Sequence, residues 1–268
     1  MGRFAGALLV ALLSTNTLTA QEMWLGQTGA RTLGLELLRP DLRYGATGLA
    51  AFATLRWPFG AYERVVAEVG VAHIEQPAVA LGSPGYYVPA ASGTSLGNPY
   101  LGVELGGPDA QWVGEVGVRF PVASNSSAAL VAGLNSDVER RDAFVGDAFS
   151  VSGYENLRLR FANGFSLRAR VGPGLVLGGR SIFGDRGLWL GYAAQVGYDR
   201  GRLNLRAGIS GRVKEAEMSQ LVLSAAFPLG GVRPGLSLRV PLDQGFNAVG
   251  SVVLGLTLGF EFRGRSMP

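Results

Sequence analysis

The stretch LRLRFANGFSLRARV, residues 157–171, decides the fold of this 268-residue chain. Apolar and polar residues alternate on both sides of Asn163-Gly164, and a period of two is typical of a β-strand with two different faces. Asn-Gly between two such runs is the strongest short-range signal for a tight hairpin. The stretch therefore predicts two antiparallel strands with an apolar face and an opposite face that carries Arg158, Arg160, Arg168 and Arg170.

The same alternation recurs along the chain and predicts about twelve strands. An even number is what a single-chain membrane barrel of antiparallel strands requires. The alternating runs lie at 33–37, 49–57, 65–71, 99–105, 116–120, 157–161, 165–171, 188–196, 203–209, 221–227, 236–240 and 252–262.

The lengths of the connections between these runs give an independent check on the strand count. Every second connection is short: 58–61, 106–111, 162–165, 199–202 and 229–233. The others are equal or longer: 39–46, 75–98, 121–148, 178–187, 213–219 and 241–247. Outer-membrane barrels have short periplasmic turns and longer extracellular loops, and a wrong strand count would scramble this parity.

The composition indicates which face of the strands meets the surroundings. Hydrophobic residues make up 47% of the chain and charged residues only 16%, against roughly 25% charged residues in an ordinary soluble domain. The face opposite the apolar one carries Gly, Ser, Ala and isolated Arg or Glu, and not the dense charges of a solvated surface. Backbone groups in lipid must all be paired, which forces the sheet to close. We therefore predict an all-β, closed antiparallel transmembrane barrel with its apolar face toward lipid.

The first residues have the pattern of a secretory signal peptide. A short basic start precedes an apolar run from Phe4 to Leu13, and the small Ala20 stands at the expected cleavage site. This run is too short to span a bilayer. We expect residues 1–20 to be a signal peptide and residues 21–268 to form a single barrel domain in the bacterial outer membrane. Its expected partners are the lipid bilayer and the outer-membrane assembly machinery.

One hairpin also carries a resemblance to a known group of proteins. Residues 97–105 (GNPYLGVEL), followed after a short turn by residues 115–121 (EVGVRFP), resemble a hairpin of the transporter barrels grouped with phenol-degradation outer-membrane proteins. The resemblance covers some 25 residues and implies an outer-membrane location and transport of hydrophobic or small solutes, without defined catalytic residues. The chain departs from the usual outer-membrane pattern at its end, because Phe262 is followed by Arg263–Pro268 and not by the chain terminus.

The polar faces of the strands supply the candidate functional residues, which we expect to line the lumen. An Arg-lined pore favours anions, whereas the same charges could also form an internal salt-bridge network that only fills the barrel. The predicted pore-lining residues are Arg56, Glu68, Glu104, Glu115, Arg119, Arg158, Arg160, Arg168, Arg170, Arg206 and Arg239. By the same phase we also expect Glu36, Arg64, Glu155, Arg212 and Glu261 in the lumen.

The connection 121–148 is too long to be an idle loop by default. Leu130, Leu134 and Val138 lie at helical spacing, and charged residues follow at 139–142. A short amphipathic helix here would fold over the mouth or into the lumen as a constriction, or would pack on a neighbouring loop. The loop 75–98, which contains Tyr86 and Tyr87, could contact a ligand or be a plain surface loop.

The sequence offers little material for catalysis or cofactor binding. His73 is the only histidine, and its phase puts it on the lipid-side face, where it is no general base. A Gly-x-Ser-x-Gly elbow and a His-Glu-x-x-His zinc pair do not occur, and there is no cysteine. The net charge of +4 is spread along the chain and not gathered into the patch that nucleic-acid binding requires. We expect no enzyme activity, no cofactor, no metal and no nucleic-acid partner.

Two functions fit these observations. The first is a passive channel or transporter for small anionic or hydrophobic solutes, with an Arg-rich lumen and access controlled by the 121–148 loop. The second is a structural or surface-interaction barrel with a plugged interior.

Overall fold

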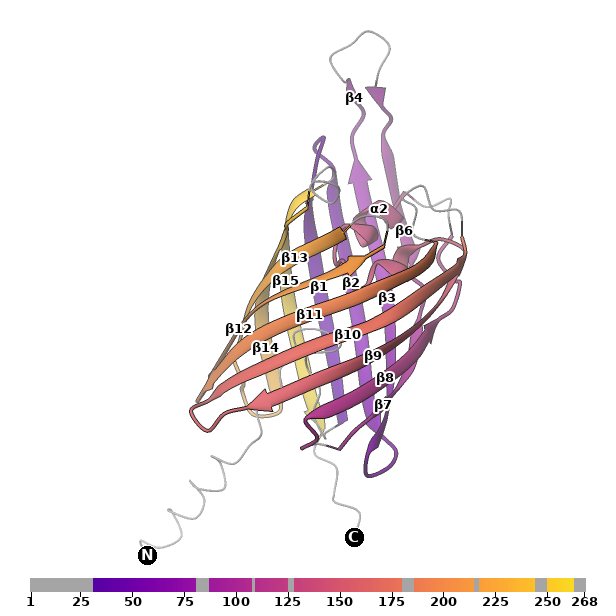
Figure 1. Ribbon diagram of the computed structural model, residues 1–268. Helices are drawn as coiled ribbons and strands as arrows, with labels where there is room; N and C mark the ends of the chain where they lie inside the picture. The colour runs from indigo at the N-terminus through magenta and orange to yellow at the C-terminus, as the bar shows by residue number, and fades with distance from the viewer. Residues whose placement is uncertain are drawn as a thin grey trace, which may run out of the picture.

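The computed structural model is a closed β-barrel of tilted antiparallel strands (Figure 1). It describes residues 31–80, 87–107, 109–124, 128–179, 186–214, 217–243 and 250–262. The predicted signal peptide, residues 1–20, lies outside the described residues, as do residues 81–86 of the 75–98 loop. Within the described part, no helix is both long and apolar enough to cross a membrane.

The barrel strands follow one another around the ring in chain order. They are β1 (Arg31–Leu42), β2 (Thr47–Pro58), β3 (Glu63–Gln76), β6 (Ala91–Leu96), β7 (Tyr100–Leu105), β8 (Trp112–Arg119), β9 (Ala148–Arg160), β10 (Phe165–Gly178), β11 (Gly187–Arg200), β12 (Leu203–Val213), β13 (Glu217–Ala226), β14 (Val232–Pro241) and β15 (Gly250–Phe262). β15 pairs with β1, and the pairing of β2 with β3 closes the ring. A two-stranded ribbon, β4 (Val79–Ala80) and β5 (Tyr87–Val88), extends the connection between β3 and β6.

The predicted count of twelve strands is confirmed once β6 and β7 are recognised as two parts of one barrel strand. Both pair with β3, so the thirteen strands of the sheet occupy twelve positions around the ring. The break falls at residues 97–99. Pro99 has no backbone N–H to donate to the ladder, while its carbonyl accepts a bond from the Phe120 N–H at 3.0 Å.

The register of the opening hairpin agrees with its sequence pattern. In the β9–β10 pair, Leu167 lies opposite Leu159 and Arg168 lies opposite Arg158. Gly164 closes the turn with a φ of +88°, a backbone conformation that glycine adopts without the steric cost of a Cβ. Within residues 157–171, one face of this hairpin is therefore apolar and the other is basic.

The apolar faces of the strands point outward, the reverse of a soluble barrel. Leu236, Leu254 and Leu256 are each more than half exposed, at 54%, 59% and 57%. Near the short turns, Trp57, Tyr62 and Trp112 are also exposed, as expected for an aromatic belt at a membrane boundary. The prediction that lipid meets the apolar face is borne out by this arrangement. The assignment of the short turns to the periplasm stays a prediction.

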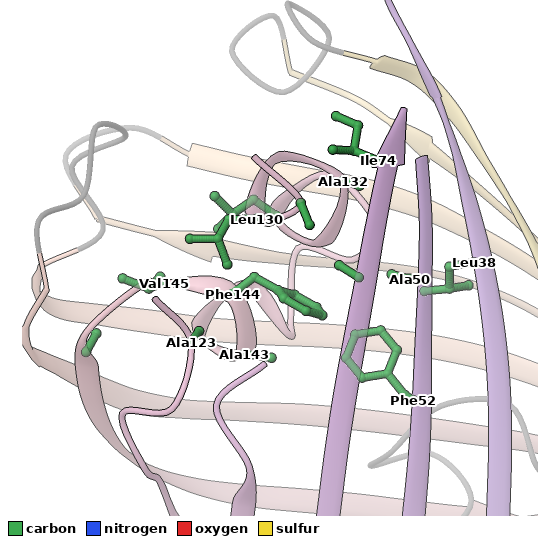
Figure 2. Packing of buried hydrophobic residues seen from close by; sticks show 14 of the residues in the cluster. Leu38, Ala50, Phe52, Ile74, Ala123, Leu130, Ala132, Ala143, Phe144 and Val145 are labelled. Atoms are coloured by element: carbon green, nitrogen blue, oxygen red, sulfur yellow. The ribbon is translucent and has the colours of Figure 1, made fainter. Parts of the chain in front are cut away.

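A small apolar cluster lies inside the barrel, at the end away from the short turns. Its helical part is α2 (Leu130–Leu134) with the 3-10 helix η1 (Arg141–Phe144). Figure 2 shows side chains of these elements meeting those of β1 to β3, with Phe144 close to Phe52. The two rings meet edge to face, with centroids 5.7 Å apart. The long connection between β8 and β9 thus packs on the inner wall of the barrel.

A charge placed on the outer wall tests which face meets lipid. Leu256→Arg, midway along β15, should lower the free energy of unfolding in bilayers by about 2–4 kcal/mol, and Leu188→Arg near a strand end by about 0–1 kcal/mol. Denaturant unfolding in lipid vesicles measures both. Equal, small effects at the two positions would contradict an outer wall buried in hydrocarbon.

Candidate functional site

The described residues of the connection between β8 and β9, 120–124 and 128–147, are folded into the barrel and are called here the inserted loop. Its Asp137 accepts a hydrogen bond from Gln220 of β13 at 3.0 Å and lies 3.7 Å from the Arg239 guanidinium of β14. Its Arg140 forms ion pairs with Glu36 of β1 and Glu68 of β3. Since these strands lie on different sides of the ring, a segment that contacts all of them must lie within the lumen.

Asn98, in the break between β6 and β7, fixes both ends of the inserted loop. Its Oδ1 accepts hydrogen bonds from the backbone N–H groups of Val122 and Ala123, at 2.9 and 2.8 Å. Its Nδ2 donates to the backbone carbonyls of Asp142 and Val145, at 2.9 and 2.7 Å. The side chain is fully buried, so one amide ties the entry of the loop to its exit.

A buried charge network anchors the inserted loop to the barrel wall. The guanidinium of Arg140 contacts three carboxylates: Glu36, Glu68 at 3.4 Å, and Asp137 at 2.8 Å. Arg239 bonds Glu36 at 2.8 Å. A buried ion pair contributes little net stability compared with apolar packing, but removal of one partner leaves an uncompensated charge and is strongly destabilising. The network therefore specifies where the loop sits.

The electrostatics of this network keep the loop carboxyl ionised. Burial alone would raise the pKa of Asp137, but the guanidinium groups of Arg140 and Arg239 outweigh it and lower that pKa from 3.8 to about 2. The same carboxylates, chiefly Glu36 and then Asp137, overcome the effect of burial on Arg140 and raise the pKa of its guanidinium.

A second set of ion pairs joins β2, β3, β7, β8 and β10. Glu104 pairs with Arg56 at 3.0 Å and with Arg64 at 3.6 Å. Glu115, directly opposite Glu104 in the sheet register, accepts a bond from the Tyr100 hydroxyl at 2.7 Å and lies 3.4 Å from Arg170. Like charges opposite one another destabilise a sheet, and here each carboxylate has its own cationic neighbour.

The lumen near the short turns is dominated by positive charge. Arg158 and Arg168 lie directly opposite each other on β9 and β10, and Arg206 of β12 adds a third guanidinium close enough to repel Arg168. Asp199 is the anion that pairs with Arg206. We call Arg158, Arg168 and Arg206 the basic cluster. All three side chains are buried in the barrel.

The structure places most of the sequence-predicted site residues in the interior. Ten of the eleven predicted pore-lining side chains are buried, and only Arg160, the last residue of β9, is exposed. The arginines of the opening hairpin separate into two groups, because Arg170 pairs with Glu115 while Arg158 and Arg168 stay in the basic cluster. Whether these residues line a conducting pore stays a prediction.

The five additional residues expected in the lumen divide into three groups. Glu36, Arg64 and Arg212 are buried, and Glu261 pairs with Arg233 near the rim at 3.4 Å. The prediction for Glu155 was wrong, because it is exposed on the outer wall. Asn156 and Arg158 of the same strand are buried, so the strict alternation of β9 turns Glu155 to the other side, together with the half-buried Leu157.

Sequence reasoning did not identify the residues that position the inserted loop. Arg140 belongs to the charged stretch 139–142, whereas Asp137 lies outside it, and nothing in their spacing shows which strands they contact. Asn98 could have been singled out by the Asn-Pro pair that interrupts an alternating run, since that pair is a turn signal.

The remaining chemistry-bearing residue, His73, lies on the face of β3 opposite to the buried Ala72 and Ile74. Its Nδ1 lies 2.9 Å from the Thr94 hydroxyl on the neighbouring strand, and its side chain is about half exposed at 44%. Among the described residues, no group of histidines and carboxylates could hold a metal ion. The expected absence of enzyme activity stays a prediction.

Comparisons with known proteins identify the fold. No protein-family model matches the chain, and no curated protein does. Among solved structures, the KdgM porin is 8% identical, with a TM-score of 0.54 over 87% of this chain and 99% of that one. The translocator domain of the autotransporter NalP from Neisseria meningitidis is 10% identical, with a TM-score of 0.52 over 96% and 94%.

A third solved structure, the β domain of the Bordetella autotransporter Brka, is 12% identical, with a TM-score of 0.50 over 88% of this chain and all of that one. These likenesses show that the barrel fold is that of bacterial outer-membrane proteins. The fold and the apolar outer wall together confirm the predicted location in the outer membrane. The narrower resemblance to the phenol-degradation group stays a prediction.

Loss of the Asn98 amide should release the inserted loop. Asn98→Ala leaves the buried carbonyls of Asp142 and Val145 and the buried N–H of Ala123 without this partner, so we expect a loss of at least about 2 kcal/mol of stability. Trypsin should then cut the folded barrel after Arg140 or Arg141, which are buried in the wild type. Asn156→Ala, which removes a bond to the Val113 carbonyl on the wall, should leave the loop protected. A trypsin-resistant Asn98→Ala barrel would contradict the role of this amide.

The low pKa of Asp137 makes its contribution depend on pH in a defined direction. A lowered pKa gives stability that is present above the unfolded value and is lost as the pH falls through the folded value. At about pH 4 the inserted loop of the wild type should resist pepsin better than that of Asp137→Asn, and around pH 2 the two should be cut alike. A difference that disappears already at pH 4 would show that the arginines do not hold Asp137 ionised.

Proposed function

We propose that this chain forms a passive outer-membrane channel for small solutes, with a preference for anions. The observation that carries the proposal is the charge of the interior. Among the described residues, twelve buried arginines face six buried carboxylates. A confined lumen with excess positive charge attracts anions and repels cations, because charges interact strongly where water is scarce.

The two halves of the lumen have different roles in this proposal. The basic cluster lies near the short turns, and the inserted loop occupies the other half. Positive charge near the short turns would concentrate anions in that half. The inserted loop, held by ion pairs and one amide and not by a continuous sheet, is the element that would control passage.

A plugged structural barrel is the second candidate, and a specific observation favours it. Phe144, Ala132 and Leu130 pack with residues of β1 to β3 into a buried apolar cluster, and such packing would stabilise a permanently filled interior. Arg140 and Arg239 add cross-links to the wall. The two functions differ in whether the inserted loop ever leaves its place.

Conductance in planar bilayers separates the two functions. The wild-type barrel should pass ions with a reversal potential in a salt gradient that shows anion preference. The pair Arg168→Gln and Arg206→Gln should shift that potential toward cation preference, because it removes two of the three charges of the basic cluster. Arg140→Gln should increase the open time or the conductance, since it loosens the inserted loop.

Arg200→Gln is the matched control, because this arginine is exposed at a turn and its loss should leave the reversal potential unchanged. If neither the wild type nor Arg140→Gln conducts, the chain is a plugged barrel and the channel proposal is wrong.

A further inference from the structure

A small cavity lies between the inserted loop and the wall formed by β7 to β12. Its volume is about 30 Å³, enough for about one or two water molecules. Hydrogen-bond donors dominate its lining. The wall contributes Arg119, Arg170 and Arg212, while the loop contributes Arg140 together with the acceptors Glu139 and Asp142.

Aromatic rings hold two of the wall arginines in fixed planes. The guanidinium of Arg170 lies 3.4 Å from the centre of the Tyr154 ring, and that of Arg212 lies 4.0 Å from the centre of the Trp189 ring. A guanidinium that stacks on a ring donates its hydrogen bonds in its own plane, along the edge, where it can form two parallel bonds to one partner. That planar fork matches a carboxylate, so these arginines are arranged for bidentate recognition.

The indole of Trp189 is an unused donor at the same place. Its Nε1 is buried and has no hydrogen-bond partner among the described residues, and the whole side chain is only 5% exposed. Indole Nε1–H can only donate, and a buried donor without an acceptor costs about 1–3 kcal/mol. The cavity is therefore short of an acceptor beside Arg212.

The inserted loop already supplies acceptors to this wall. The Asp142 carboxylate pairs with Arg212, and the backbone carbonyl of Glu139 accepts a second bond from the same guanidinium. The Glu139 side chain also lines the cavity. In effect, the loop places carboxylates where an anionic solute would bind. Because the cavity is too small for a solute beside the loop, binding of the two must be competitive.

We propose that this cavity is the binding site for the carboxylate of a small organic-acid solute. The solute carboxylate takes the place of Asp142 on Arg212 and accepts the free hydrogen bond of Trp189, and the inserted loop is thereby released. This inference deepens the proposed channel function by naming the solute class and the contact that opens the channel, and it rests on that function. By linkage, a solute that binds only where the loop is displaced shifts the loop toward the displaced state.

A single engineered thiol measures release of the loop. The chain contains no cysteine, and Ser136 in the inserted loop is fully buried, with its hydroxyl donating to the Gly133 carbonyl at 2.7 Å. Ser136→Cys should react slowly with a charged, membrane-impermeant maleimide. Replacement of sodium chloride by sodium acetate at constant ionic strength should raise the labelling rate about tenfold, which corresponds to about 1.4 kcal/mol.

Two further variants in the Ser136→Cys background make the test specific. Asp142→Asn should label fast without acetate, because the tether to Arg212 is gone. Trp189→Phe keeps a ring under Arg212 but removes the donor, so about tenfold more acetate should be needed, the loss expected for one hydrogen bond to a charged group. Trp112→Phe, on the exposed outer rim, should respond as the parent does.

The proposal is overturned if acetate leaves labelling unchanged while Asp142→Asn labels fast, or if Trp189→Phe keeps the full response. It is also overturned if Asp142→Asn labels as slowly as its parent. Labelling needs no ion flow, so the two proposals can fail separately. If acetate speeds labelling but the barrel never conducts, the binding-site proposal stands and the channel proposal is wrong. If the barrel passes anions but acetate has no effect on labelling, the channel proposal stands and the binding-site proposal is wrong.

Discussion

The rest of the structure depends on one constraint, which is that hydrocarbon cannot satisfy polar groups. Backbone N–H and C=O groups in lipid must pair with each other, and a ring of strands is the way a sheet achieves this without an edge. The strict alternation of the strands then sends most of their charged side chains inward. Inside the barrel those charges are close together and shielded from bulk water, so they form ion pairs across strands and with the inserted loop.

The pairing has a characteristic geometry. Carboxylates of the wall, such as Glu36 and Glu68, each contact an arginine of the wall and the single Arg140 of the loop. The loop is therefore an integral part of the barrel interior. It completes the charge balance of one half of the barrel, whereas the half near the short turns keeps an excess of arginine. That asymmetry is the physical basis for assigning passage control and anion attraction to different ends.

The sequence alone predicted the barrel wall well, because in a strand each side chain must point to the face opposite that of its neighbour. Once Leu157 faces lipid, Arg158 must face the lumen, and the same reasoning placed ten of the eleven predicted residues in the interior. Glu155 was assigned to the wrong face although the alternation itself holds there. Its position two residues before Leu157 puts it on the same, outer face. The interior of the barrel was harder to predict. Contacts such as that of Asp137 with Arg239 join residues about a hundred positions apart, and no local periodicity encodes them.

The role of Asn98 could be predicted only in part from the sequence. Asn-Pro is a turn signal and could have indicated a local break, but it could not show that the Asn98 amide holds both ends of a loop 25 to 47 residues further on. Tertiary contacts of this kind form when the inserted loop folds back onto the break between β6 and β7.

The reach of the charge network bears on the order in which the molecule folds. The Glu36–Arg239 pair spans 203 residues of sequence, and Arg140 of the loop bonds the same glutamate from 104 residues away. Neither contact exists until the first and the last strands have met, and contacts of such long range form late and slowly. The ion pairs of Glu36 therefore belong to the final step of folding, so the inserted loop is fully anchored only after the first and last strands have paired.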